Sequence, residues 1–123
     1  MLKTTSTAVI ALFAACLIAT SVHAHPTLKS ASPPVEGNAT TSPTQITLSF
    51  SEGVISKFSS VELRDQSGMK VPTGKIGTDA KDEKQLIVTL QAPLKAGTYT
   101  VKWTVVTADT HRVNGTYSFK VAG

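Results

Sequence analysis

Cysteine and methionine are scarce in this chain. The single cysteine among 123 residues is Cys16, inside an apolar N-terminal segment. Residues 25–123 contain none, so no disulfide stabilises them, and any metal ion bound there is bound without a thiolate. Met69 is the only methionine beyond Met1. One thioether does not make a site for a soft metal ion, so a methionine-based site is disfavoured.

Long apolar runs and clustered charges are lacking as well. The longest apolar run, Ala8–Ala19, is shorter than the ~20 residues that a membrane-spanning helix needs. Beyond this run, Lys and Arg are scattered among Asp and Glu. We therefore expect a mixed, solvated surface and no nucleic-acid binding, which would need a basic stripe or a recognition element. The length fits one domain with one core.

The N-terminal segment is typical of a secretory signal peptide. Lys3 precedes the apolar run, and polar residues follow it. Val22 and Ala24 stand where a signal peptidase requires small or compact residues. We therefore expect residues 1–24 to be removed on secretion and residues 25–123 to form the mature domain.

Cys16 leaves a second processing route open. The preceding Phe13-Ala14-Ala15 loosely resembles a lipoprotein processing site, and lipidation at Cys16 would leave His25 inside the chain. The phenylalanine before the two alanines and the apolar residues after Cys16 favour cleavage after Ala24 instead.

Short segments of alternating apolar residues make up most of the remaining chain. Ile46, Leu48 and Phe50 alternate with polar residues, as do Val61 and Leu63. The same spacing recurs at Leu86, Val88 and Leu90, at Tyr99, Val101, Trp103 and Val105, and at Tyr117, Phe119 and Val121. Period-two spacing with β-branched and aromatic residues predicts an all-β sandwich or barrel with Greek-key connections and about seven strands.

Turn-forming residues separate these segments. The two prolines in Ser32–Asn38 cannot donate to a strand ladder, and Gln66-Ser67-Gly68 predicts a turn. The polar and charged stretch Thr73–Lys84 is expected to be a loop or an irregular edge. The longest strand is expected at Thr98–Thr107.

Two histidines remain after cleavage at Ala24, His25 and His111. His25 would become the N-terminal residue and would offer a free amine and an imidazole Nδ1, which together can chelate Cu(II). Pro26 has no backbone amide to deprotonate, which excludes the N-terminal copper motif that uses the amides of the second and third residues. The sequence therefore favours the amine-plus-imidazole chelate.

Asp109 and His111 stand two residues apart, just beyond the longest expected strand. If the extended conformation persists, both side chains project to one side of the sheet, in phase with Trp103 and Val105. With His25 they supply an amine, two imidazoles and a carboxylate, which suit tetragonal Cu(II). An isolated Asp-x-His pair often only caps a turn, so the metal hypothesis depends on its combination with His25.

Two other residues have competing interpretations. Glu52 follows the strand that ends at Phe50, where it is a weak metal ligand, an acceptor that orients an imidazole N–H, or a solvated carboxylate. Trp103 lies on the apolar face of its strand, so a place in the core is favoured over a redox role.

Several motifs, taken in order, resemble those of the CopC family of periplasmic copper resistance proteins. They are His25-Pro26-Thr27-Leu28, Ser32-Pro33-Pro34-Val35-Glu36-Gly37, Leu48-Ser49-Phe50-Ser51-Glu52, Gly97-Thr98-Tyr99-Thr100-Val101-Lys102-Trp103 and Asp109-Thr110-His111, followed by Gly115 and Phe119. The resemblance covers essentially all of residues 25–123. It implies an immunoglobulin-like Greek-key β-barrel in the periplasm that binds one Cu(II) ion. Carried over by position, the ligands would be His25, Asp109 and His111, with Glu52 close by.

The chain departs from the family pattern in two places. The residue between the Asp and the His is often glycine in the family, and here it is Thr110. Some members carry a methionine-rich loop for Cu(I), whereas the corresponding stretch Asp65–Lys84 contains only Met69. The chain therefore looks like a Cu(II)-only member.

The resemblance favours a monomeric binding module, not an enzyme, that sequesters copper or carries it to a partner. The partner that the family implies is a CopD-type membrane copper transporter or a multicopper oxidase. Two alternatives stay open. One is a copper-dependent oxidative enzyme with a histidine-brace site, in which an open coordination position activates oxygen. The other is a metal-free β-sandwich that serves adhesion or assembly.

Overall fold

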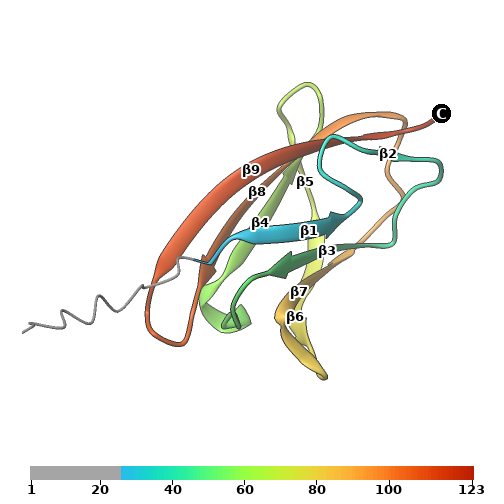
Figure 1. Ribbon diagram of the computed structural model, residues 1–123. Coiled ribbons are helices and arrows are strands. Elements are labelled where there is room, and N and C mark those ends of the chain that lie inside the picture. The colour runs from blue at the N-terminus through green and yellow to red at the C-terminus, as the bar shows by residue number, and fades with distance from the viewer. Residues whose placement is uncertain (1–25) are drawn as a thin grey trace, which may run out of the picture.

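The computed structural model describes residues 26–123, which form two packed β-sheets (Figure 1). The first sheet has the strand order β1-β3-β7-β6 and the second β2-β9-β8-β4-β5. In the first sheet the strands are β1 (Leu28–Ser32), β3 (Gln45–Phe50), β6 (Thr73–Asp79) and β7 (Asp82–Leu90). In the second they are β2 (Asn38–Ala39), β4 (Ser60–Arg64), β5 (Lys70–Val71), β8 (Gly97–Val106) and β9 (Arg112–Val121).

The connections cross repeatedly between the two sheets. The chain passes from one sheet to the other between β1 and β2, between β2 and β3, between β3 and β4, between β5 and β6, and between β7 and β8. One 3-10 helix, η1 (Ser56–Phe58), lies in the connection between β3 and β4. The prediction of an immunoglobulin-like β-sandwich is confirmed. The seven longer strands match the expected number, and the two-residue strands β2 and β5 are additional.

The core consists of the apolar residues that alternate along the strands. Side chains from β3, β7, β8 and β9 fill the space between the sheets, and Leu63 of β4 joins them. The rings of Phe50 and Trp103 meet edge to face with centroids 5.1 Å apart, and Tyr99 stacks on Phe119 at 5.6 Å. Trp103 is 7% exposed, which confirms its place in the core.

The structure decides between the two alternatives expected for Thr73–Lys84, a loop or an irregular edge, in favour of the edge. Most of this stretch is paired, because β6 forms the edge of the first sheet and β7 begins at Asp82. Its register against β7 shifts twice, so it is an irregular edge strand and not a loop. Backbone pairing does not require apolar side chains on an edge strand, which is why a polar composition concealed it.

The signal peptide expected at residues 1–24 lies outside the described residues. Across the part of the chain that the structure describes, no helix is long and apolar enough to cross a membrane.

The turn expected at Gln66-Ser67-Gly68 is present. Gly68 has a positive φ of 86°, and the Asp65 carboxylate accepts hydrogen bonds from the backbone N–H groups of Ser67 and Met69.

Gly115 gives Trp103 the room that its indole needs. The two residues are directly paired between β8 and β9. A Cβ atom added at Gly115 would lie 2.7 Å from Cε2 of Trp103, closer than real carbon atoms approach. The absence of a side chain at position 115 therefore allows the indole to lie against the neighbouring strand and to reach Phe50.

We predict that Gly115→Ala destabilises the protein by about 1–3 kcal/mol, because the indole must move out of a packed position. Gly77→Ala is the matched control, since a Cβ there has no heavy atom within 4 Å. Urea unfolding followed by far-ultraviolet circular dichroism measures both. Equal stability of the two variants would contradict the packing described for Trp103.

Candidate metal centre

The turn between β8 and β9 carries both Asp109 and His111. The carbonyl of Thr107 accepts a hydrogen bond from the N–H of Thr110 at 2.9 Å, and the N–H of Thr107 donates to the carbonyl of His111 at 3.0 Å. These two bonds enclose a three-residue loop of the kind in which a type I turn is followed by a left-handed residue. Thr110 is the left-handed residue, with φ at 67°. The turn thus fixes the backbone on both sides of the pair.

Asp109 and His111 meet, but not for the reason that the sequence suggested. The extended conformation does not persist, since β8 ends at Val106 and the chain turns at Thr110. Nδ1 of His111 nevertheless lies 2.9 Å from Oδ2 of Asp109. A left-handed conformation is unusual for a β-branched residue, whereas glycine adopts it freely. The hydroxyl of Thr110 donates to the carbonyl of Asp109 at 2.6 Å.

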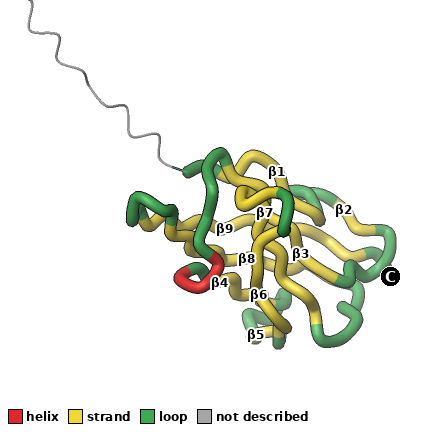
Figure 2. Tube along the Cα trace, turned by 90° about the horizontal axis from the view of Figure 1, so that it is seen from below, coloured by secondary structure: helices red, strands yellow, loops and turns green. Residues whose placement is uncertain are grey.

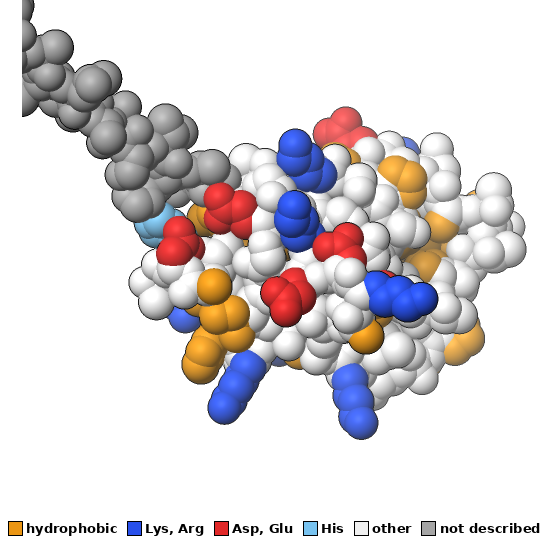
Figure 3. Space-filling view, turned by 60° about the horizontal axis from the view of Figure 1, so that its bottom comes forward, with side chains coloured by type: hydrophobic (Ala, Val, Ile, Leu, Met, Phe, Trp, Pro, Cys, Tyr) orange, Lys and Arg blue, Asp and Glu red, His pale blue; other side chains and the backbone are white. Residues whose placement is uncertain are grey.

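Thr107 holds Asp109 in its ionised form. The hydroxyl of Thr107 donates to Oδ1 of Asp109. This hydrogen bond is the largest influence on the pKa of Asp109 and lowers it below its ordinary value. Desolvation of the carboxyl group raises the pKa by less, and electrostatic interaction with His111 is a still smaller contribution that lowers it. The Asp109 side chain is 51% exposed and that of His111 is 33% exposed. Figure 3 shows a histidine side chain at the surface with acidic side chains beside it.

A depression of about 240 Å³ includes Asp109 in its lining. Glu52 and Glu83 also line it, so three carboxylates face this space. Its walls are joined through Val54, whose N–H donates to the carbonyl of Glu83 at 3.0 Å and which forms an isolated β-bridge with Thr107. The structure therefore brings Glu52, half-buried after β3, to the same depression as Asp109.

The start of the described chain is held beside Glu52. The N–H of Thr27 donates to Oγ of Ser51 at 2.9 Å, and the N–H of Ser51 donates to the carbonyl of Thr27 at 2.9 Å. Pro26 is fully buried. Figures 1 and 2 show the start of β1 at the same end of the sandwich as the β8–β9 turn. His25 itself lies outside the described residues.

The described residues provide part of the expected ligand set. Among residues 26–123, no three His, Cys, Asp or Glu side chains form a group that could hold a metal ion. Asp109 and His111 form a pair, with Glu52 on the same depression as Asp109. The third ligand residue expected from the sequence, His25, is not among the described residues.

Sequence reasoning missed Thr107 and Glu83. Thr107 is 2% exposed and is in phase with Trp103 and Val105 on the buried face of β8. The hydroxyl of a threonine at a buried position needs a hydrogen-bond partner. The expected burial of Thr107 could therefore have suggested that it pairs with the nearby Asp109. Glu83 gave no such signal, because its place on the depression depends on the pairing of β7 with β3, which are far apart in the sequence.

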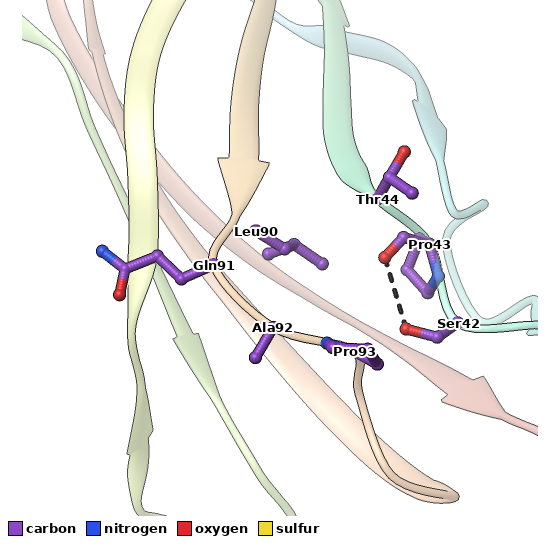
Figure 4. A pocket seen from close by; sticks show the side chains of 7 residues that line it. All are labelled: Ser42, Pro43, Thr44, Leu90, Gln91, Ala92 and Pro93. Atoms are coloured by element: carbon purple, nitrogen blue, oxygen red, sulfur yellow. Dashed lines mark hydrogen bonds between the residues drawn. The ribbon is translucent and has the colours of Figure 1, made fainter.

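A second depression, of about 200 Å³, lies at the opposite ends of β3 and β7 (Figure 4). Ser42, Thr44, Leu90 and Gln91 contribute to its lining, and no charged residue or histidine does. The hydroxyl of Ser42 is engaged there, since it accepts a hydrogen bond from the N–H of Leu94 at 2.7 Å. This depression lacks the side chains that a metal ion requires.

The comparison with known protein families matches nearly all of the described chain. A model of the CopC domain matches residues 28–122. The chain belongs to the CopC family. The matched region contains Glu52, Asp109 and His111, and it begins three residues after His25.

Relatives within the CopC family are similar over nearly their whole length. The copper resistance protein C of Xanthomonas campestris pv. juglandis is 40% identical over 117 residues, which cover 91% of each chain. That of Pseudomonas syringae pv. tomato is 38% identical, with 94% of this chain and 95% of the relative covered. The protein YobA of Escherichia coli is 39% identical over 91% of this chain and 90% of its own.

Solved CopC structures have the same architecture. CopC from Methylosinus trichosporium OB3b is 33% identical, with a TM-score of 0.74 over 80% of this chain and 94% of that chain. PcoC, a methionine-rich copper resistance protein from Escherichia coli, is 39% identical, with a TM-score of 0.72 over 80% of this chain and 99% of its own. With Met69 as its only methionine in residues 25–123, this chain differs from PcoC in that respect.

We predict that Thr107→Val raises the pKa of Asp109 toward its ordinary value, because the hydroxyl that stabilises the carboxylate is removed. A pH titration of the Asp109 carboxyl carbon by NMR in the metal-free protein measures this change. The native pKa lies below the unfolded one, so the stabilisation is present above the unfolded-state pKa and is lost as pH falls through the native pKa. The stability difference between wild type and variant should therefore shrink in acid.

Asp65 is the internal control for this titration. Its pKa is lowered by the hydroxyl of Ser67 and the N–H of Met69, at the opposite end of β4 and β8 from Thr107. It should stay low in Thr107→Val. An unchanged pKa for Asp109 would show that Thr107 does not control its ionisation.

Proposed function

We propose that this CopC-family protein is a periplasmic Cu(II)-binding protein that sequesters copper or carries it for resistance and homeostasis. Export would remove residues 1–24 and expose His25 as the first residue. One ion per mature chain would be bound by the amine and imidazole of His25, by Asp109 and by His111. Glu52 would lie close to the ion, as a ligand or as an acceptor for an imidazole N–H.

The observation that carries this proposal is the convergence of two chain segments at one end of the sandwich. The Asp109–His111 pair, with 2.9 Å between Oδ2 and Nδ1, is fixed there by the β8–β9 turn. The chain that follows His25 is fixed there by the two hydrogen bonds between Thr27 and Ser51. Only Pro26 separates His25 from Thr27 in the sequence, so this short connection would keep the amine and imidazole of His25 near this end.

The chemistry of these groups suits Cu(II). Imidazole, amine and carboxylate are nitrogen and oxygen ligands, and Cu(II) heads the affinity order of divalent first-row ions for such sites. The carboxylate must be ionised to bind a metal ion, and the hydroxyl of Thr107 lowers the pKa of Asp109 in support of that form. Copper resistance in the names of the relatives points to the same metal.

Binding without catalysis fits this ligand set better than oxidative chemistry. An oxygen-activating histidine-brace site needs an open coordination position, whereas an ionised Asp109 can occupy one. We therefore propose no enzymatic activity. Copper-loaded protein with reductant and polysaccharide would give no soluble oxidised oligosaccharides.

A copper transport protein is the proposed recipient of the ion. The copper transport protein CutJ of Bacillus subtilis is 27% identical to this chain over 98 residues, which are only 18% of its own length. In that protein a domain similar to this one is covalently joined to a much longer chain. We propose that this chain acts as a monomer and docks on a separate CopD-type transporter much as the similar domain is joined to the rest of CutJ. We favour this partner over a multicopper oxidase.

We predict that one glycine added before His25 in the mature protein lowers the Cu(II) affinity by more than about tenfold, because it separates the amine from the imidazole while leaving every side chain in place. Competition with a chromophoric Cu(II) chelator at neutral pH measures the affinity. The matched control is one glycine added after Gly123, which should change nothing.

His111→Ala extends the same test to the β8–β9 turn, and its Cu(II) affinity should fall as well. Undiminished affinity in the N-terminally extended protein would rule out the His25 chelate. If the N-terminal extension lowers the Cu(II) affinity but His111→Ala does not, Asp109 and His111 of the β8–β9 turn are not part of the site. Wild-type protein that retains no Cu(II) after dialysis would favour the metal-free alternative.

A further inference from the structure

Phe58 is a large aromatic side chain that the fold leaves in solvent. It is 58% exposed and is the last residue of η1. The helix begins one residue after Ile55, which lines the depression together with Glu52, Glu83 and Asp109. Ile55 is half-buried and lies one turn before Phe58. We call Ile55 and Phe58 the apolar ridge. Figure 3 shows hydrophobic side chains projecting next to acidic ones and a histidine on this face.

Hydrogen bonds hold the backbone under the apolar ridge in one place. The N–H of Ile55 donates to the carbonyl of Val106 at 2.8 Å, and the N–H of Phe58 donates to the carbonyl of Ile55 at 3.1 Å. The hydroxyl of Ser59 donates to the carbonyl of Ile55 at 2.7 Å and accepts the N–H of Val106 at 3.2 Å. The ridge is therefore attached to the last residue of β8, immediately before the turn with Asp109. A backbone that is already held in place loses little entropy when a partner covers it.

The charged side chains that line the depression beside the apolar ridge are all acidic. Glu52, Glu83 and Asp109 supply three carboxylates, and no Lys or Arg lines that space. Lys57, the basic residue of η1, is exposed and directly precedes Phe58 in the sequence. An anionic lipid surface would be repelled by the carboxylates, so a membrane is a poor occupant. A protein with an apolar pocket and a basic rim is complementary to this face.

We propose that the apolar ridge is the docking surface for the copper transport protein, with Phe58 inserted into an apolar pocket whose Lys and Arg rim faces Glu52, Glu83 and Asp109. This inference rests on the proposed function, because it names how the recipient approaches the copper site. Docking there places the recipient beside Asp109 and His111. Single exposed aromatic side chains that fill a pocket commonly dominate such interfaces.

The test uses the full mature protein and the CopD-type transporter of the same organism, reconstituted in phosphatidylcholine vesicles. Wild-type protein should bind these vesicles saturably, and Phe58→Ser should bind about tenfold more weakly or worse. Met69→Ser is the matched control, since Met69 is 68% exposed in the β4–β5 turn at the other end of the sheet. Glu83→Lys should weaken binding less, and high salt should remove most of that difference.

Each other outcome overturns the proposal. Equal binding of wild type and Phe58→Ser, or no saturable binding of wild type, excludes docking through the ridge. Equal binding to transporter-free phosphatidylcholine or phosphatidylglycerol vesicles identifies a lipid surface instead. Self-association in sedimentation that Phe58→Ser abolishes identifies a second copy of the chain.

Copper uptake separates this proposal from the proposed function. Phe58→Ser should bind one Cu(II) ion as the wild type does, because Phe58 is not a ligand. A wild type that takes up no Cu(II) contradicts the proposed function. A wild type that takes up Cu(II) but binds the transporter no better than Phe58→Ser contradicts only the docking surface.

Discussion

The pairing of β8 with β9 is the constraint on which the rest of this molecule depends. Ten residue pairs, from Gly97–Val121 to Val106–Arg112, are in register without a shift. A slip of β9 by one residue would turn its apolar side chains, such as Phe119, out of the core and would change the turn that joins the strands. Gly115 opposite Trp103 fits this register, since only a residue without a side chain leaves room for the indole. Core packing and the position of Asp109 and His111 are thus set by one hairpin.

The other segments at this end of the sandwich add to what the hairpin positions. The end of β3 brings Glu52 and, through Ser51, the chain that follows His25. The start of β7 brings Glu83, and the loop before η1 joins both strands to Thr107 through Val54. A rigid β scaffold that presents short loops at one end is a common arrangement for binding sites. Here the loops gather carboxylates and an imidazole beside an exposed aromatic side chain.

The fold could be predicted from the sequence because period-two spacing reports directly which side chains face the core. Ile46, Leu48 and Phe50 are buried as the spacing predicted. The site was harder, because turn geometry is not periodic. The sequence paired Asp109 with His111 by assuming an extended strand, whereas the pair forms through a left-handed Thr110. No local sequence pattern pointed to Glu83 or to the apolar ridge. Each acquires its neighbours only when strands that are distant in the sequence pack together.

His25 remains the decisive residue of the account, because its amine becomes a ligand only if the chain begins there. The most direct test is the native mass of the exported protein, measured with and without added Cu(II). We expect a chain that begins at His25 and gains the mass of one copper ion. A lipid on Cys16, or a different first residue together with retained copper, would contradict the N-terminal chelate. A chain that begins at His25 and gains no copper would contradict the proposed function itself.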